Sequence, residues 1–183
     1  GAVYLSVFHP DFELLMDTKK INADEKIRLT TLSIGAIIPD KFMELAEKNE
    51  NCYAFYPHSI YQKYGVHLDE IKMDEWYDKL AQDDEIEKKE INPRELLTRI
   101  AQTQQESGYP YVVFIDSANQ QHTLKDVGMI KMSNLCCEIF QYQTPSDIKG
   151  YGQVSDWGQD ISCNLGSLNI ANVMDNKDIE KTI

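Results

Sequence analysis

The chain has 183 residues, 42% of them hydrophobic, and its 30 acidic and 18 basic side chains give a formal net charge of -12. This length and apolar content fit one globular domain with a sizeable core. The negative charge argues against a surface that grips nucleic acid through its phosphates. Small phosphorylated ligands remain open, because helix N-termini bind phosphate through backbone N–H groups.

Targeting signals are also missing from the sequence. It has no signal-peptide pattern, and no apolar run approaches the ~20 residues that a membrane span needs. We therefore expect a soluble, cytoplasmic protein without a membrane partner. The sequence opens on Gly1 directly in a β-prone run and ends on Ile183, so we expect a single-domain piece, residues 1–183, of a longer polypeptide.

The first half of the chain alternates strand-like and helical patterns. Phe12, Leu15 and Met16 form an apolar stripe at helical spacing, and Pro10 is suited to the first helical turn. We expect strands at 3–8 and 28–38. We expect helices at 10–19 and 39–49, a further short helix that ends at Gly65, and a helix at 74–82. The aromatic segment 50–57 is predicted to be turn-rich, and the acidic run 82–87 to be a solvated segment.

The second half begins with the clearest helix signal. Asn92 as the N-cap, Pro93 at the first helical position and Glu95 as in a capping box predict a helix that Gly108 ends. We then expect a strand at 109–116 that is buried on both faces, a polar loop at 117–128, a strand at 129–140, a surface loop at 144–158 and a strand pattern at 160–170. This alternation predicts an α/β fold with parallel strands covered by helices.

One stretch, residues 133–139 (Ser-Asn-Leu-Cys-Cys-Glu-Ile), places an amide, two thiols and a carboxylate within five positions. In an extended backbone Asn134, Cys136 and Glu138 project to one face and Cys137 to the other. Positions two apart in a strand are roughly 6.5 to 7 Å apart, so the first three side chains could flank a small ring such as a sugar. A carboxylate buried beside a thiol would have a raised pKa and suit general-base chemistry.

The four cysteines are expected to be thiols, because nothing marks the chain as secreted. Cys163 follows Cys136 by 27 residues and could lie on a neighbouring strand, whereas Cys52 is assigned to core packing. A zinc site built from all four is one alternative, but the adjacent Cys136 and Cys137 do not have zinc-ligand spacing. A hydrolytic cysteine with His122 as its base is a second alternative, without an oxyanion-hole signature.

These motifs resemble the large catalytic subunit of class I ribonucleotide reductase, and most of all its class Ib form. The resemblance rests on residues 133–139 and on Cys163 within the sequence Asp-Ile-Ser-Cys-Asn-Leu-Gly-Ser-Leu. Supporting segments are Gly-Ala-Val-Tyr-Leu at 1–5, His-Pro-Asp at 9–11, Asn-Ala-Asp-Glu-Lys-Ile-Arg at 22–28 and Glu-Ser-Gly-Tyr-Pro-Tyr at 106–111. Cys137 departs from the family pattern, in which we expect a small serine.

The resemblance implies part of a ten-stranded α/β barrel with a central finger loop. Cys136 would become a thiyl radical that abstracts the 3′-hydrogen of a ribonucleoside diphosphate, with Glu138 as base on the 3′-hydroxyl. Asn134 would hydrogen-bond the sugar hydroxyls, and Cys163 would end in a disulfide with a cysteine outside this chain. The substrate-contacting residues that it implies are Asn134, Leu135, Cys136, Cys137 and Glu138.

The resemblance also implies the partners. No cofactor or metal is bound by this chain itself; a beta subunit with a manganese or iron pair supplies the radical, and a glutaredoxin- or thioredoxin-like dithiol supplies the electrons. Nucleotide effectors and a second large subunit are expected, with the effector site largely outside these residues. Because these parts are missing, the piece should not turn over alone. The alternative from another class is a non-catalytic α/β scaffold whose cysteines only pack.

Overall fold

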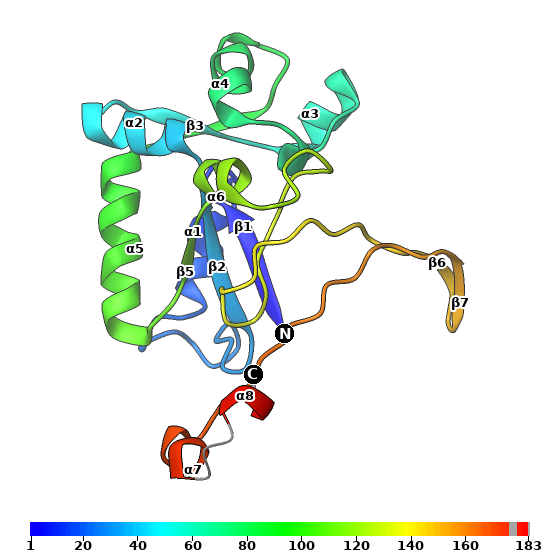
Figure 1. Ribbon diagram of the computed structural model, residues 1–183. Helices are drawn as coiled ribbons and strands as arrows, with labels where there is room; N and C mark the ends of the chain where they lie inside the picture. The colour runs from blue at the N-terminus through cyan, green and yellow to red at the C-terminus, as the bar shows by residue number, and fades with distance from the viewer. Residues whose placement is uncertain (176–178, 183) are drawn as a thin grey trace.

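A three-stranded parallel sheet forms the centre of the protein in the computed structural model, which describes residues 1–175 and 179–182. The strands are β1 (Ala2–Ser6), β2 (Ser33–Ile38) and β5 (Tyr111–Phe114), in the order β1-β2-β5. The middle strand is almost wholly buried. The predicted parallel α/β arrangement is confirmed (Figure 1).

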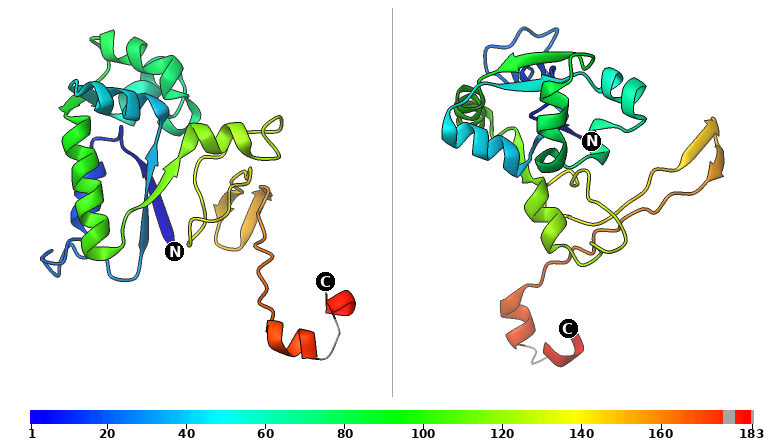
Figure 2. Two further views of the ribbon diagram at one scale, coloured as in Figure 1. Left: turned by 60° about the vertical axis from the view of Figure 1, so that its left-hand side comes forward. Right: turned by 90° about the horizontal axis from the view of Figure 1, so that it is seen from above.

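Helices cover one face of this sheet. Three of them are α1 (Phe12–Asp17), α2 (Asp40–Lys48) and α5 (Pro93–Ser107), and the core between helices and sheet includes Ala36 and Ile38 from β2. Figure 2 shows α5 running along the side of the sheet. The other described helices are α3 (Pro57–Tyr64), the 3-10 helix η1 (Leu68–Glu70), α4 (Met73–Gln82), α6 (Ile115–Gln121), α7 (Ile170–Asp175) and α8 (Ile179–Thr182).

The termini of α5 follow the predicted signals. The Asn92 side chain accepts a hydrogen bond from the backbone N–H of Glu95 at 2.9 Å, and Pro93 occupies the first turn. Gly108 ends the helix at φ 77°, a left-handed conformation that glycine adopts without strain.

A two-stranded antiparallel ribbon closes the far end of the core. It pairs β3 (Cys52–Phe55) with β4 (Lys88–Ile91), Cys52 lying opposite Ile91. The prediction of turns at 50–57 was therefore wrong, because the partner strand lies more than thirty residues away in sequence. Cys52 is fully buried as predicted, and burial raises the pKa of its thiol to about 12.

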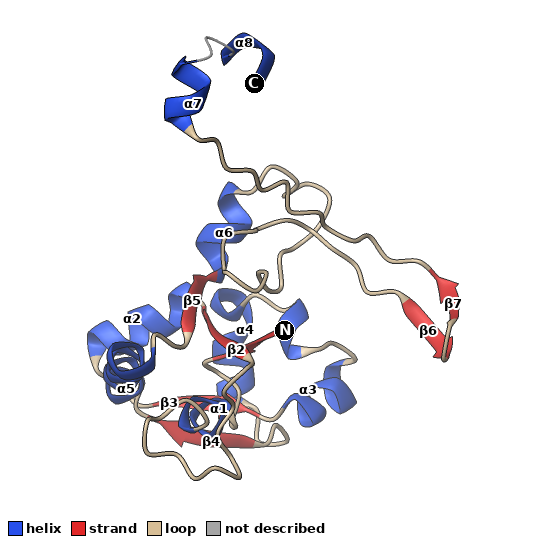
Figure 3. Ribbon diagram, turned by 90° about the horizontal axis from the view of Figure 1, so that it is seen from below, coloured by secondary structure: helices blue, strands red, loops and turns tan. Residues whose placement is uncertain are grey.

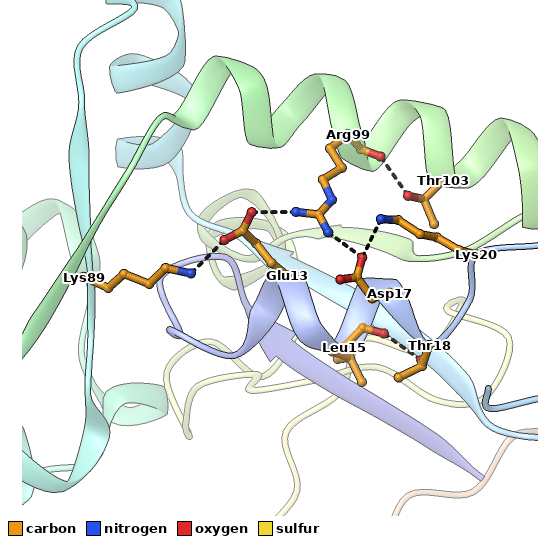
Figure 4. Close-up of polar contacts among 8 residues, drawn as sticks. All are labelled: Glu13, Leu15, Asp17, Thr18, Lys20, Lys89, Arg99 and Thr103. Carbon is orange, nitrogen blue, oxygen red and sulfur yellow. Dashed lines mark hydrogen bonds and ion pairs between the residues drawn. The ribbon is translucent and has the colours of Figure 1, made fainter. Parts of the chain in front are cut away.

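An ion-pair network fastens α1 to α5 (Figure 4). The Arg99 guanidinium of α5 contacts the carboxylates of Glu13, at 2.6 Å, and Asp17. Lys89 joins the same Glu13 carboxylate at 2.8 Å, and Lys20 binds Asp17 at 2.8 Å. Because Lys89 belongs to β4, the network joins both helices to the antiparallel ribbon.

Beyond β5 the chain departs from the predicted elements. Residues 115–121 form α6 where a loop was predicted, and 129–140 contain no strand. Residues 144–158 hold a hairpin of β6 (Asp147–Gly150) and β7 (Gln153–Asp156) where a surface loop was predicted. The hairpin lies at the tip of a long arm that leaves the body and returns, as Figure 3 shows. The strand predicted at 160–170 is also wrong, because no described strand pairs with that segment.

Candidate functional site

A tight turn, not a strand, carries the reactive side chains. The backbone N–H of Cys137 donates to the Asn134 carbonyl at 3.1 Å, and Cys137 has φ 62°. The Asn134 side-chain oxygen accepts from the backbone N–H groups of Glu138, at 2.9 Å, and Ile139, at 3.1 Å. Asparagine competes with regular structure through such local bonds, which explains why the β-prone neighbours did not form a strand. We call residues 134–138 the cysteine turn.

The cysteine turn gathers the predicted residues around one carboxylate. The Asn134 amide nitrogen donates to Oε1 of Glu138 at 2.8 Å. The Cys163 sulfur lies 4.0 Å from the same oxygen. The negative charge of Glu138 raises the pKa of the Cys136 thiol. An amide, two thiols and a carboxylate are thus in one place, although the predicted strand face is replaced by a turn.

Cys163 reaches the turn because the arm doubles back. At its base, the N–H of Thr144 donates to the Gln159 carbonyl at 3.3 Å, and the N–H of Gln159 donates to the Thr144 hydroxyl at 2.8 Å. A Cβ on Gly158 would lie 2.0 Å from the Thr144 carbonyl oxygen, so the two limbs approach as closely as only glycine permits. The returning limb then places Cys163 beside Glu138.

The two adjacent cysteines point to different surroundings. Cys136 is exposed, whereas the Cys137 thiol donates to the Val112 carbonyl of β5 at 3.9 Å. Leu135 is half exposed at the tip. Glu138 is exposed as well, so the condition of burial that would raise the pKa of this carboxylate is not met. Within the described residues the reactive groups therefore face an open side.

The segment that leads into the turn is fixed to the body by polar contacts. The Asn119 side chain of α6 accepts from the N–H of Ile130 at 2.7 Å and donates to its carbonyl at 3.1 Å. Lys131 pairs with Asp69 of η1 at 2.9 Å. These contacts align the chain just before the cysteine turn.

A cavity of about 310 Å³ lies between this segment and the carboxyl ends of β1 and β2. Its lining includes His9, Pro39, Asp116 and Met132, and Tyr4 lines the side that faces the cysteine turn. Ligands of open parallel sheets bind at this end of the strands. The sequence did not predict this cavity, because its walls come from segments far apart in the chain.

Three carboxylates near the mouth of this cavity could hold a cation. Oxygens of Asp40, Asp74 and Asp116 lie within 4.8 Å of one another. The backbone N–H of Asp40 donates to Asp116 at 2.7 Å, and burial raises the pKa of Asp116. Asp40 and Asp74 are exposed, and no motif spacing in the sequence would have identified the group.

The geometry argues against both alternative uses of the cysteines. Cys52 is buried in the core while Cys136 and Cys163 are exposed, so the four thiols cannot share one ion. His122 is buried, at 9% exposure, and neither of its ring nitrogens bonds to any described residue. A histidine base would have to hydrogen-bond its nucleophile.

No helix among the described residues has the length and apolar character needed to cross a membrane.

All 183 residues match the family model described as ribonucleotide reductase, barrel domain. Among curated proteins, the chain is 51% identical over all of its length to the ribonucleoside-diphosphate reductase subunit alpha of Bacillus subtilis (strain 168), covering 26% of that protein. It is 46% identical over 96% of its length to the subunit alpha of Mycoplasma genitalium, covering 24%.

A more distant relative is the ribonucleoside-diphosphate reductase large subunit of Plasmodium falciparum, 29% identical over 95% of this chain and covering 20% of that protein. The chain thus spans about a quarter of the length of the Bacillus subtilis and Mycoplasma genitalium relatives and a fifth of the Plasmodium falciparum relative. Together with the parallel α/β sheet and the cysteine turn, these matches show that the chain belongs to the ribonucleotide reductase family and carries sequence of its barrel domain.

Proposed function

We propose that this chain supplies the radical cysteine and part of the redox machinery with which a ribonucleoside-diphosphate reductase makes 2′-deoxyribonucleoside diphosphates. The observation that carries the proposal is the grouping of the Asn134 amide, the Cys163 sulfur and the Cys136 thiol around the Glu138 carboxylate. The nucleoside diphosphate substrate, the radical-generating partner subunit and the dithiol reductant are also part of the proposal, because they act with a whole subunit.

Each side chain has a role that its position supports. Cys136, as a thiyl radical, takes the 3′-hydrogen atom of the ribose, while Glu138 accepts the proton of the 3′-hydroxyl. The 2′-hydroxyl leaves as water, and the ribose takes up two electrons. Cys163 and a second cysteine of the intact subunit supply those electrons, and their two thiol protons go to the leaving hydroxyl and to the ribose as the disulfide forms. The 3′-hydrogen then returns to the ribose from Cys136. The Asn134 amide hydrogen-bonds the sugar hydroxyls.

The turn geometry suits this chemistry. A hydrogen-atom abstractor must approach the ring from one side and be held there, which positioning of the substrate against a fixed thiol achieves. The carboxylate beside Cys136 raises the pKa of the thiol and so keeps its proton in place. The thiol hydrogen is then available for transfer as an atom when the radical arrives.

Replacing Cys136 by serine in the intact subunit tests the proposal. We expect Cys136→Ser to abolish reduction of ribonucleoside diphosphates in the presence of partner subunit and reductant, because an O–H bond does not exchange its hydrogen atom with the ribose. The control is Cys52→Ala, which removes a thiol from the core and should retain activity if the protein folds. Activity that survives in Cys136→Ser would favour a scaffold role.

A further inference from the structure

Tyr4 of β1 stands beneath the cysteine turn, on the face of the sheet opposite to Leu5 and the helix-covered core. Its hydroxyl donates to the backbone carbonyl of Asn134 at 2.7 Å. The same carbonyl accepts the N–H of Cys137 that closes the turn. A side chain 130 residues away in sequence therefore bonds to the atom on which the turn depends.

Gly35 of β2 makes room for the Tyr4 ring. The two residues are direct partners in the parallel register of β1 and β2. A Cβ at Gly35 would lie 2.2 Å from Cδ1 and from Cε1 of Tyr4, too close for any side chain. The ring thus crosses the sheet over a strand position that only glycine can occupy, and its hydroxyl is directed at the turn.

The Tyr4 hydroxyl supports the cysteine turn from a distant strand. It also contacts the side chains of Cys137 and Ser133, and burial followed by the Cys137 hydrogen bond raises the pKa of Tyr4. The turn is also held by the bond from the Ser133 hydroxyl to the Ile139 carbonyl at 2.8 Å, by the long thiol contact of Cys137 and by the Asn134 side-chain bonds. Glu138 and Cys136 themselves are exposed.

We infer that Tyr4, seated on Gly35, is a positioning residue that holds Cys136 at its place beside Glu138. The inference rests on the proposed function, since it names what fixes the geometry of the proposed radical cysteine. Tyr4 acts through the Asn134 carbonyl and through the turn. The tyrosine was not predicted from the sequence, because nothing local in 2–6 distinguishes it from an ordinary strand aromatic.

Thiol reactivity tests the positioning without any turnover. In the intact subunit, Tyr4→Phe removes one hydroxyl and keeps the ring, and alkylation of Cys136 by iodoacetamide is followed by peptide mass spectrometry from pH 7 to 10. The charged or titratable groups facing this thiol are Glu138, Cys163 and Tyr111. A loosened turn moves Cys136 away from the Glu138 carboxylate, so its raised pKa should fall towards the usual value.

The expected result is alkylation of Cys136 about threefold or more faster at pH 8 in Tyr4→Phe, because a lower pKa leaves more of the thiol as the reactive thiolate. Gly35→Ala should act in the same direction, because its Cβ displaces the ring although the hydroxyl is present. The matched control is Tyr64→Phe, which loses a hydroxyl bond to Asp83 of 2.5 Å outside the turn and should alkylate like the wild type. Equal rates in Tyr4→Phe and wild type overturn the inference.

Kinetics provide a second measurement. For a displaced radical cysteine we expect kcat of Tyr4→Phe to fall about tenfold or more, while KM for the nucleoside diphosphate stays within about twofold. A variant that only lost stability would show a normal kcat per folded molecule, as we expect for Tyr64→Phe. A normal kcat per folded molecule in Tyr4→Phe would also contradict the inference. If Cys136→Ser instead retained reduction, the proposed function would fail while the alkylation experiment would still decide the role of Tyr4.

Discussion

At the residue scale, the Cys163 thiol is exposed and lies 4.0 Å from the carboxylate that Cys136 also contacts. If it supplies electrons together with a second cysteine of the intact subunit, one turnover without external reductant must leave it in a disulfide. We expect peptide mass spectrometry after rapid alkylation to find Cys163 oxidised when partner subunit and nucleoside diphosphate are both present. Without substrate it should be alkylated, and a free Cys163 after turnover would contradict its role.

The sequence predicted which residues of the site belong together but not how they meet. Asn134, Cys136, Glu138 and Cys163 were named from their residue types and spacing, and the structure groups them. The prediction that a strand carries them was wrong because the Asn134 side chain accepts hydrogen bonds from two backbone N–H groups within five residues. The periodicity of the sequence does not reveal such local bonds. Tyr4 was missed because its contact spans 130 positions.

At the scale of elements, Asp83 joins the end of α4 to α3. Its carboxylate accepts from Lys63 at 2.7 Å, from the Tyr64 hydroxyl at 2.5 Å and from the N–H of Glu85 at 3.0 Å, and these bonds lower its pKa to about 2. Since the unfolded-state pKa of an aspartate is about 3.9, the stabilisation is present above about pH 4 and is lost as the pH falls towards 2.

Asp83→Asn should therefore lower the free energy of unfolding at pH 7. Between about pH 4 and pH 2 the stability of this variant should fall less than that of the wild type, because the linked proton uptake is gone. Urea unfolding at a series of pH values measures both effects. The control Asp84→Asn removes the same charge from an exposed neighbour and should leave the dependence of stability on pH unchanged. If the stability of Asp83→Asn fell between pH 4 and pH 2 as much as that of the wild type, the proposed link between Asp83 protonation and stability would be ruled out.

Elements with local signals were predicted well and those with remote partners were not. The cap at Asn92 and the glycine ends at Gly65 and Gly108 are where the sequence places them. The ribbon of β3 and β4 was missed because Lys88–Ile91 is rich in charge and becomes a strand only by pairing with β3. Helix α6 was missed in a segment whose polar composition is also typical of loops.

At the scale of the whole molecule, the body and the arm differ in how they are stabilised. The body encloses an apolar core, whereas the arm and the segment after it expose large apolar side chains, namely Ile148, Tyr151 and Trp157 in the arm and Leu165, Leu168, Ile170 and Met174 after it. The strand pattern at 160–170 calls for a neighbouring strand, and none of the described strands pairs with it. The pattern at 160–170 could therefore not be assigned correctly from the sequence, whereas the hairpin of β6 and β7 was missed because its residues are also typical of a surface loop.

The share of the relatives that this chain covers leads to a prediction about the whole enzyme. Of the four cysteines, Cys136 and Cys163 are the exposed thiols at the site, and the proposed two-electron step needs a cysteine besides these two. The 183-residue chain should therefore show no turnover with partner subunit and reductant added. Exchanged for the matching quarter of the Bacillus subtilis subunit alpha, to which it is 51% identical, it should give an active reductase.

The exchange separates the chemistry of this chain from the contribution of the surrounding polypeptide. Formation of deoxyribonucleoside diphosphate is the measurement, and the same chimera with Cys136→Ser is the control that should be inactive. A folded chimera without activity would show that the cysteine turn of this chain does not serve reduction, and turnover by the 183 residues alone would show that no outside cysteine is needed. The two expected results together require both the Cys136 thiol of this chain and a redox partner from the rest of the subunit.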